Sequence, residues 1–279
     1  MKRPICLSPL KFYDSEKKQN HRKTYAYGRV SPVITKLHVI PSFQFVIPNN
    51  LTILSVYIKD INSNNVTGNI LQILVNNGLS IKTVDDISVI MFCSYEQVLN
   101  TIPEGFYYIV IKLSDSTEYY SEIFCFTANL EKYLEIEYWN ASGDLYIHNG
   151  IITFSDNFRF KMYVNYEKET IFEFEEQANN RLGYRDIESQ VSKKLYAFIT
   201  IVPEFMCDAM RIIRLCDNKK IRIKNEEYDL IAFEMEADWL TQGDLAAVTC
   251  RFESDQVITS LTERNLAEYN SDFNSDFTV

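Results

Sequence analysis

Residues 194–217 read KLYAFITIVPEFMCDAMRIIRLCD, and this stretch decides the fold. The apolar run at 195–202 is rich in β-branched and aromatic side chains, which predicts a strand covered on both faces. Pro203 ends that strand. Because proline fits the first turn of a helix, a helix is predicted over residues 203–216. Its apolar side chains recur at three- and four-residue spacing, so one wide face should pack on a sheet.

The strands of that sheet follow directly in the chain. From residue 229 apolar and acidic side chains alternate, which predicts a half-buried antiparallel strand. Its inward side chains should be Ile231, Phe233, Met235, Ala237 and Trp239, and its outward ones Glu234, Glu236 and Asp238. After a turn at 241–244, the inward side chains should be Ala246, Val248, Cys250 and Phe252. A helix on antiparallel strands predicts an α+β or barrel-like unit.

The preceding part of the chain reads as a β-rich domain over residues 41–128. Strands are expected at 43–47, 51–60, 87–93, 106–113 and 119–126. Residues 114–117 predict a polar hairpin turn between the last two strands. The segment 69–78 fits a short helix or a strand equally well, because its periodicity favours neither. Several short strands ending in a tight hairpin favour an immunoglobulin-like β-sandwich.

Residues 129–260 read as a second domain, an antiparallel β domain that carries the amphipathic helix. Further strands are expected at 133–139, 151–154, 157–164 and 170–176. In the last of these, Phe172 and Phe174 should face inward. Residues 177–186 are polar and contain glycine, which predicts an exposed loop, and residues 261–279 read as a C-terminal tail. The expected fold class is therefore mainly β (α+β).

Composition bounds the class of protein. The chain has 279 residues and is 46% hydrophobic, which suffices for a real core and two domains. It has no apolar run of about 18 residues and no signal-peptide pattern, so neither a membrane span nor secretion is expected. Most of the six cysteines lie in apolar runs without a C-x-x-C pair, and only three histidines occur. Reduced buried thiols are therefore expected, with no metal site and no cofactor.

Charge is distributed unevenly along the chain. The net charge is −10, yet residues 1–36 hold nine Lys and Arg against two acidic residues. A basic N-terminal arm at residues 1–40 could bind nucleic acid, or it could lie across an acidic area of a neighbouring copy. Its interleaved aromatic residues favour the second alternative. The candidate interface residues of the arm and the tail are Arg22, Lys23, Tyr25, Tyr27, Arg29, Phe273 and Phe277.

No catalytic constellation is apparent, and the chain is not expected to be an enzyme. G-x-S-x-G and glycine-rich phosphate loops do not occur. Glu173, Glu175 and Glu176 suggest the paired carboxylates of a polysaccharide hydrolase, but their alternation with aromatic residues favours a solvated strand face. The aromatic content leaves open a carbohydrate- or receptor-binding module. Four tyrosines in the expected hairpin should instead pack across strands.

Five stretches together carry a resemblance. They are NHRKTYAYGR at 20–29, PEGFYY at 103–108, YYSEIFC at 119–125, FMCDAMRIIRLCD at 205–217 and QGDLAAVTC at 242–250. This set resembles structural virion proteins encoded by phages and prophages of Bacteroidetes hosts, including crAss-like phages, over most of the chain. The resemblance implies a virion component of the tail, hub, ring or baseplate, and it transfers no active-site residue.

The partners that this resemblance implies are copies of the chain itself and other virion proteins. Localisation to the virion, after assembly in the host cytoplasm, is expected. Symmetric assembly reuses one interface many times, and the arm and the tail are the natural candidates for contacting neighbours. An acidic body would let DNA pass through a ring lumen without specific binding, since like charges repel.

Overall fold

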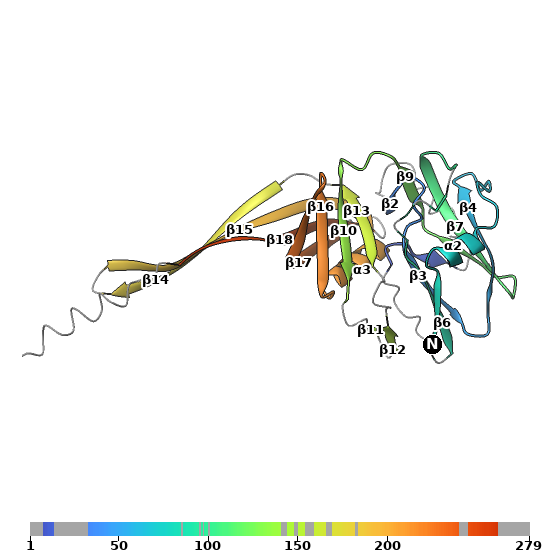
Figure 1. Ribbon diagram of the computed structural model, residues 1–279, viewed down its shortest axis with the longest axis horizontal. Coiled ribbons are helices and arrows are strands. Elements are labelled where there is room, and N and C mark those ends of the chain that lie inside the picture. The colour runs from blue at the N-terminus through green and yellow to red at the C-terminus, as the bar shows by residue number, and fades with distance from the viewer. Residues whose placement is uncertain are drawn as a thin grey trace, which may run out of the picture.

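The computed structural model is mainly β and elongated (Figure 1). It describes residues 8–13, 33–84, 86–94, 96, 98–99, 101–140, 144–147, 150–153, 159–165, 169–181, 184–239 and 245–261. A body of packed sheets occupies most of the molecule, and a thin ribbon of strands projects from one end of it (Figure 1). Neither of the described helices has the length or apolarity needed to cross a bilayer.

The first half of the chain forms two sheets. Its elements are β1 (Phe12–Tyr13), β2 (Val33–Lys36), β3 (Phe43–Pro48), β4 (Ile53–Asp60), α2 (Leu71–Asn76), β5 (Ser80–Val84), β6 (Ile87–Phe92), β7 (Gly105–Leu113), β8 (Glu118–Ser121) and β9 (Phe124–Thr127). One sheet has the order β1-β8-β7-β9-β2, with β4 also paired to β7, and is mixed because β2 and β9 run parallel. The other has the order β3-β6-β5.

Aromatic side chains join these two sheets into a common core. Phe12, from the mixed sheet, stacks on Phe45 of β3 with ring centroids 5.0 Å apart. Tyr119 of β8 reaches the same Phe45 ring at 5.8 Å. Such pairs add to the free energy gained by burial, so they help to fix how the layers face each other. The expected polar turn after β7 is confirmed, since Leu113 N donates to Thr117 O at 2.9 Å.

The undecided segment 69–78 contains the helix α2. The helix ends at Asn76, and the chain turns at Gly78, whose φ of +106° lies in a region that favours glycine. Leu79 N then donates to Leu74 O at 2.9 Å, which satisfies a carbonyl at the helix end. A Cβ atom at Gly78 would lie 2.8 Å from the Cys93 carbonyl oxygen. Both the backbone angle and the space therefore require glycine.

Gly78→Ala should lower the free energy of unfolding by about 1–3 kcal/mol, because it adds strain at a positive φ and a contact with backbone. Gly68→Ala is the matched control, since no atom lies within 4 Å of its added Cβ. That control should change stability by less than about 0.5 kcal/mol. Urea denaturation of both variants measures the difference, and equal midpoints would contradict this description of the turn.

The second half of the chain is dominated by one antiparallel sheet. Its elements are β10 (Tyr133–Trp139), β11 (Asp144–Ile147), β12 (Gly150–Thr153), β13 (Phe160–Asn165), β14 (Glu169–Arg181), β15 (Tyr184–Pro203), α3 (Glu204–Ile213), β16 (Asn218–Ile223), β17 (Glu226–Trp239) and β18 (Leu245–Leu261). Seven strands follow the order β13-β10-β16-β17-β18-β15-β14, and β11 and β12 form a separate hairpin.

The helix predicted at 203–216 is confirmed as α3, with shorter bounds. Pro203 has extended backbone angles and caps the helix, which begins at Glu204. Met210 and Ile213 are fully buried on the face that packs against β15, β17 and β18. The helix ends at Ile213, because Cys216 N donates to the carbonyl of Ile213, only three residues back. The inward residues predicted for β18, from Ala246 to Phe252, are buried as expected.

The strand predicted at 119–126 is wrong in one respect, because it is two strands. β8 and β9 both pair with β7, but their registers differ by one residue. At the interruption, Ile109 N donates to the Ser121 hydroxyl at 2.8 Å, and that hydroxyl donates to Glu122 O at 2.7 Å. A side chain therefore replaces a backbone partner in the ladder, as at a β-bulge.

The facing predicted for β17 is wrong at Ile231. A register shift in the pairing with β18 lies between Leu230 and Ala232, so Leu230 is buried and Ile231 is exposed. Trp239 lies on the predicted side, paired with buried Ala246, but it is exposed at the end of the strand. Phe233 faces inward, and Glu234, Glu236 and Asp238 face outward, as expected.

Two further predictions about β14 and β15 are wrong. The segment 177–186 is not a loop, because Gln177 pairs with Ser189 and the pairing continues to Arg181 with Tyr184. Residues 195–202 are not covered on both faces, because Ile199 and Ile201 are 50% and 43% exposed. Residues 177–194 are mostly polar. Backbone hydrogen bonds between β14 and β15 hold this part of the sheet together without burial of an apolar face.

The two halves of the chain meet at β13. This strand packs against β2, and the Cys93 thiol donates to Arg159 O at 2.8 Å. Most of the buried apolar residues, from Leu10 to Phe252, form one continuous cluster, and Tyr108, Val110 and Tyr120 form a second. Of the expected arm, residues 8–13 and 33–40 take part in this body, where Leu10 and Ile40 are fully buried.

Candidate functional site

The ribbon is the most distinctive surface of the molecule. We define it as β14, residues 184–194 of β15 and residues 255–261 of β18, which extend away from the body (Figure 1). At about 3.3 Å per residue, the 13 residues of β14 span roughly 40 Å. Within the described residues, β14 pairs only with β15, and β18 pairs only with β15 beyond Ser254. No described strand therefore covers either edge of the ribbon.

The ribbon carries uncovered aromatic side chains on the face that leads into the core. Phe172 and Phe174 pair across strands with Lys194 and Ser192 of β15. They lie on the same side of the sheet as Tyr196 and Phe198, which are buried. Their predicted side is thus right, but the core ends before them, so they are 60% and 78% exposed rather than buried.

The opposite face of the ribbon is polar. Lys193 Nζ lies 2.9 Å from Glu175 Oε1 and 3.5 Å from Glu253 Oε1, so one cation joins all three strands. Glu173 lies on this face and is exposed, as expected for a solvated strand face, whereas Glu176, which pairs with Gln190, is exposed on the same face as Phe174. These residues do not form a carboxylate pair that could enclose a substrate.

This polar face continues onto the body as an acidic surface with an apolar centre. Cross-strand pairing places Ile199 beside Thr249 and Glu236, and Ile201 beside Ala247 and Asp238. We define the outer face as the side chains that β14, β15, β17 and β18 direct away from α3. Its charged residues are Glu173, Glu175, Lys193, Glu234, Glu236, Asp238, Arg251 and Glu253.

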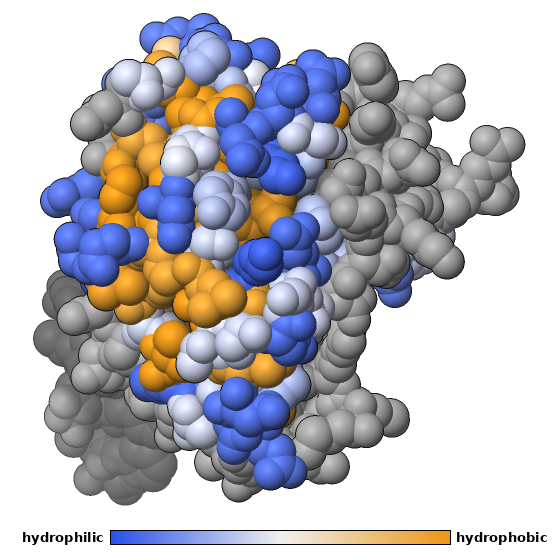
Figure 2. All heavy atoms as spheres, turned by 90° about the vertical axis from the view of Figure 1, so that its right-hand side faces the viewer, coloured by the Kyte–Doolittle hydropathy of each residue, from blue (hydrophilic) through white to orange (hydrophobic). Residues whose placement is uncertain are grey.

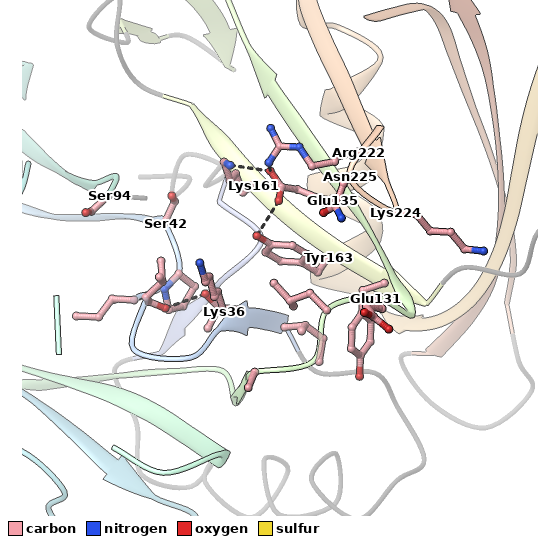
Figure 3. Close-up of a pocket in the computed structure, with 18 residues that line it drawn as sticks. Lys36, Ser42, Ser94, Glu131, Glu135, Lys161, Tyr163, Arg222, Lys224 and Asn225 are labelled. Atoms are coloured by element: carbon pink, nitrogen blue, oxygen red, sulfur yellow. Dashed lines mark hydrogen bonds and ion pairs between the residues drawn. The ribbon is translucent and has the colours of Figure 1, made fainter. Parts of the chain in front are cut away.

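The other half of the same sheet is covered by the chain around β2 and carries charges of both signs. A cavity of about 770 Å³ lies between the chain around β2 and the strands β10, β13 and β16 (Figure 3). Four cations and two carboxylates line it: Lys36, Lys161, Arg222, Lys224, Glu131 and Glu135. Its lining contains no nucleophile beside a general base, and in the part of the chain that the structure describes no His, Cys, Asp and Glu cluster suits a metal ion.

Glu135 is the centre of the ionic cluster in this cavity. It accepts hydrogen bonds from Lys161 Nζ at 2.6 Å and from the Tyr163 hydroxyl at 2.9 Å, and Arg222 lies 3.5 Å away (Figure 3). Burial, and then the nearby carboxylate, raise the pKa of Tyr163 above its usual value. The three partners come from two neighbouring strands, so Glu135 joins β10 to β13 and β16. This arrangement ties three strands of the sheet together.

Glu135→Ala should lower the free energy of unfolding by about 1–3 kcal/mol, because it leaves the Tyr163 hydroxyl and the partly exposed Lys161 and Arg222 without their carboxylate. Glu131→Ala, at the exposed rim of the same cavity, is the control and should change stability by less than about 0.5 kcal/mol. Chemical denaturation of the two variants makes the comparison. Two equally stable variants would mean that the cluster does not hold the strands together.

Acid should weaken the adjoining part of the cluster. Hydrogen bonds from Lys220 and then Arg222 lower the pKa of Glu227 from 4.5 to about 2. This carboxylate therefore stabilises the fold fully above pH 4.5, and its contribution is lost as pH falls towards 2. Because Glu227 is partly exposed, the effect should be at most about 1 kcal/mol. Thermal unfolding of Glu227→Gln between these pH values should show a shallower acid dependence than the parent, and an unchanged dependence would contradict it.

A second apolar area lies at the opposite end of the molecule. Figure 2 shows apolar side chains among polar ones on the face that β4 and α2 form at the right of Figure 1. Its large exposed apolar residues are Leu54, Ile73, Val75 and Ile81. These residues lie on short elements of the body, so they serve as controls for the projecting ribbon.

The structure answers the sequence-based expectations unevenly. The candidate interface residues Arg22, Lys23, Tyr25, Tyr27, Arg29, Phe273 and Phe277 lie outside the described residues. Tyr108 and Tyr120 pack across strands with ring centroids 6.5 Å apart, as expected, and are buried. Sequence reasoning missed the ribbon and the Glu135 cluster. The sequence shows polar residues alternating along single strands at both places. It does not show the register between strands, which decides which of these residues come together.

The described cysteines are free thiols. Cys207, Cys216 and Cys250 are buried, and Cys93 and Cys125 are half-buried. Burial raises the pKa of Cys207 to about 11 and that of Cys216 to about 12. These two thiols are therefore protonated and poorly nucleophilic at neutral pH.

Compared with known proteins, the chain matches no protein-family model, and no curated protein or solved structure is significantly similar to it.

Proposed function

We propose that this chain is a non-enzymatic structural subunit of a phage virion, a component of the tail, hub, ring or baseplate that assembles with copies of itself. The observation that carries the proposal is the ribbon, with two open edges and uncovered Phe172 and Phe174. Open edges and exposed aromatics are a liability for a solitary protein, because they invite pairing with other chains. In an assembly they become contacts.

Symmetric assembly suits this shape. A projecting element on one end and a broad body on the other give a heterologous contact, which closes into a ring if the rotation permits. Other virion proteins would meet the remaining surfaces, and assembly would take place in the host cytoplasm before the chain resides in the virion. The net charge of −10 would let DNA pass through a lumen without specific binding.

An immunoglobulin-like organisation of residues 41–128 belongs to the same proposal. The mixed sheet and the β3-β6-β5 sheet share an aromatic core, which supports a sandwich. The parallel pairing of β2 with β9 departs from a purely antiparallel arrangement. Small sandwich modules of this kind give a rigid body on which a projecting ribbon can be carried.

The proposal is tested in purified particles. Mass spectrometry of virions should detect the chain at a stoichiometry above one copy per particle, and electron microscopy should place it in the tail, hub, ring or baseplate. Treating the particles with salt to remove loosely bound host proteins provides the control. Absence of the chain from washed particles would overturn the proposal.

A carbohydrate- or receptor-binding module is the alternative, and Trp239 favours it. This side chain is 52% exposed at the end of β17, where it could stack on a sugar ring. Binding of the full chain to a polysaccharide array, lost in Trp239→Ala, would support this function. Binding to none of the host surface polysaccharides would remove it.

A further inference from the structure

We propose that the outer face receives the basic segment, residues 14–32, of a second copy of this chain. The inference rests on the proposed function, because it names the contact through which the copies assemble. The outer face belongs to β14, β15, β17 and β18, whose other side is covered in the body by α3. On this face apolar and acidic side chains lie side by side, and no described element covers them.

Among the described residues, none covers the apolar centre of this surface. Ile199 and Ile201 lie on β15 beside β18, past the described pairing of β15 with β14, and are about half exposed. Their neighbours on the inner side, Phe198 and Val202, are almost fully buried. A β-strand with large apolar residues on both faces is normally covered on both faces. A second copy of the chain would supply this cover.

The charge of the outer face indicates which kind of partner would cover it. The outer face carries six carboxylates and two cations, and in the part of the chain that the structure describes Glu234, Glu236 and Asp238 form no ion pair. On the covered half of the same sheet, by contrast, Glu135, Glu137 and Glu227 all have cationic partners. The uncompensated charge thus coincides with the uncovered apolar residues. A partner that is both basic and apolar fits both features.

The basic segment has that composition. Residues 14–32 hold five Lys and Arg against two acidic residues, together with Tyr25 and Tyr27. The segment connects β1 to β2 on the body, so it is anchored at both ends. Tyrosine offers an apolar ring for Ile199 and Ile201, and the flanking Arg22, Lys23 and Arg29 can meet carboxylates of β17.

Charge reversal in two separate full-length variants tests the assignment. One carries Arg22→Glu and Lys23→Glu, and the other carries Glu234→Lys and Glu236→Lys. Each alone should self-associate at least about tenfold more weakly than the parent, because like charges then meet. Mixed in equal amounts they should assemble, because both the reversed and the unreversed surfaces then find complements. Sedimentation velocity measures the single and mixed samples.

The control is a variant with Asp86→Lys and Glu131→Lys, which makes the same change in net charge at exposed acids outside the outer face. It should associate like the parent. Assembly that persists in the Glu234→Lys, Glu236→Lys variant, or a mixture that stays monomeric, would overturn the proposal. Circular dichroism of every variant should match the parent, since all substituted positions of known exposure lie at the surface.

A photo-crosslinking experiment separates a second copy from other occupants. A benzophenone amino acid in place of Tyr25, mixed with an isotope-labelled parent, should attach to labelled peptides that contain residues 230–239. Attachment only within one copy overturns the proposal. The proposal is also overturned if the Arg22→Glu, Lys23→Glu variant loses binding to duplex DNA while its self-association does not change. Either result would leave the presence of the chain in virions, and hence the proposed function, untouched.

Discussion

A chain in which Asn-Gly replaces residues 173–193 should fold normally and fail to self-assemble. Phe172 and Lys194 pair across β14 and β15, so a two-residue turn can close the shortened hairpin there. The side chains of known exposure on the removed part of β14 are exposed, while Tyr196, Phe198 and the rest of the core remain. Self-assembly should weaken strongly, because most of β14, the adjoining part of β15 and the open edge of β14 are gone.

Two measurements are needed on this shortened chain. Sedimentation velocity should give a monomer at concentrations where the parent assembles. Denaturation should give a free energy of unfolding within about 1 kcal/mol of that of the monomeric parent, because the core is intact. Ile81→Thr, at the exposed apolar area on the opposite end, is the control and should assemble like the parent. A shortened chain that still assembles would show that the ribbon is dispensable.

Phe198→Ala and Phe174→Ala should differ greatly in stability, although both residues lie on the same side of one sheet. Phe198 is 1% exposed and packs against Phe252, so its loss creates a cavity and should cost about 3–5 kcal/mol. Phe174 is 78% exposed and touches no core, so its loss should cost less than about 0.5 kcal/mol in the monomer. Phe174→Ala should nevertheless weaken self-association.

Chemical denaturation at a concentration where the chain is monomeric compares the two variants, and sedimentation velocity at high concentration compares their assembly. Phe172→Ala should behave like Phe174→Ala, and agreement between the two variants would show that the effect is not particular to one position. If Phe174→Ala destabilises the monomer as strongly as Phe198→Ala does, the aromatic face of the ribbon is covered within a single chain, and the ribbon is not an assembly element.

Local periodicity predicted much of the body, because alternation and helical spacing report which side of an element is buried. It located α3, the inward residues of β18 and the side on which Phe172 and Phe174 lie. It could not predict that the core ends before Phe172, since the extent of a covering layer depends on residues distant in the chain. The shift at Leu230 likewise depends on pairing with β18, which β17 alone does not encode.

The polar surfaces were harder to predict for the same physical reason. The ribbon has no core on either side, so its strands have no apolar alternation and resembled a loop over 177–186. Glu135, Lys161 and Arg222 come from three strands far apart in the sequence, and only the register of the sheet brings them together. The outer face combines four strands, and its acidic character is visible only once they are placed side by side.

Hydrogen exchange of the β14 amides, measured in the monomer and in the assembled protein, tests the central claim most directly. Amides of residues 172–180 that point away from β15 have no partner strand in the single chain. If the ribbon is an assembly element, these amides should exchange quickly in the monomer and become strongly protected on assembly. Equal exchange rates in the two states would show that no neighbouring copy contacts the ribbon, and would contradict the account.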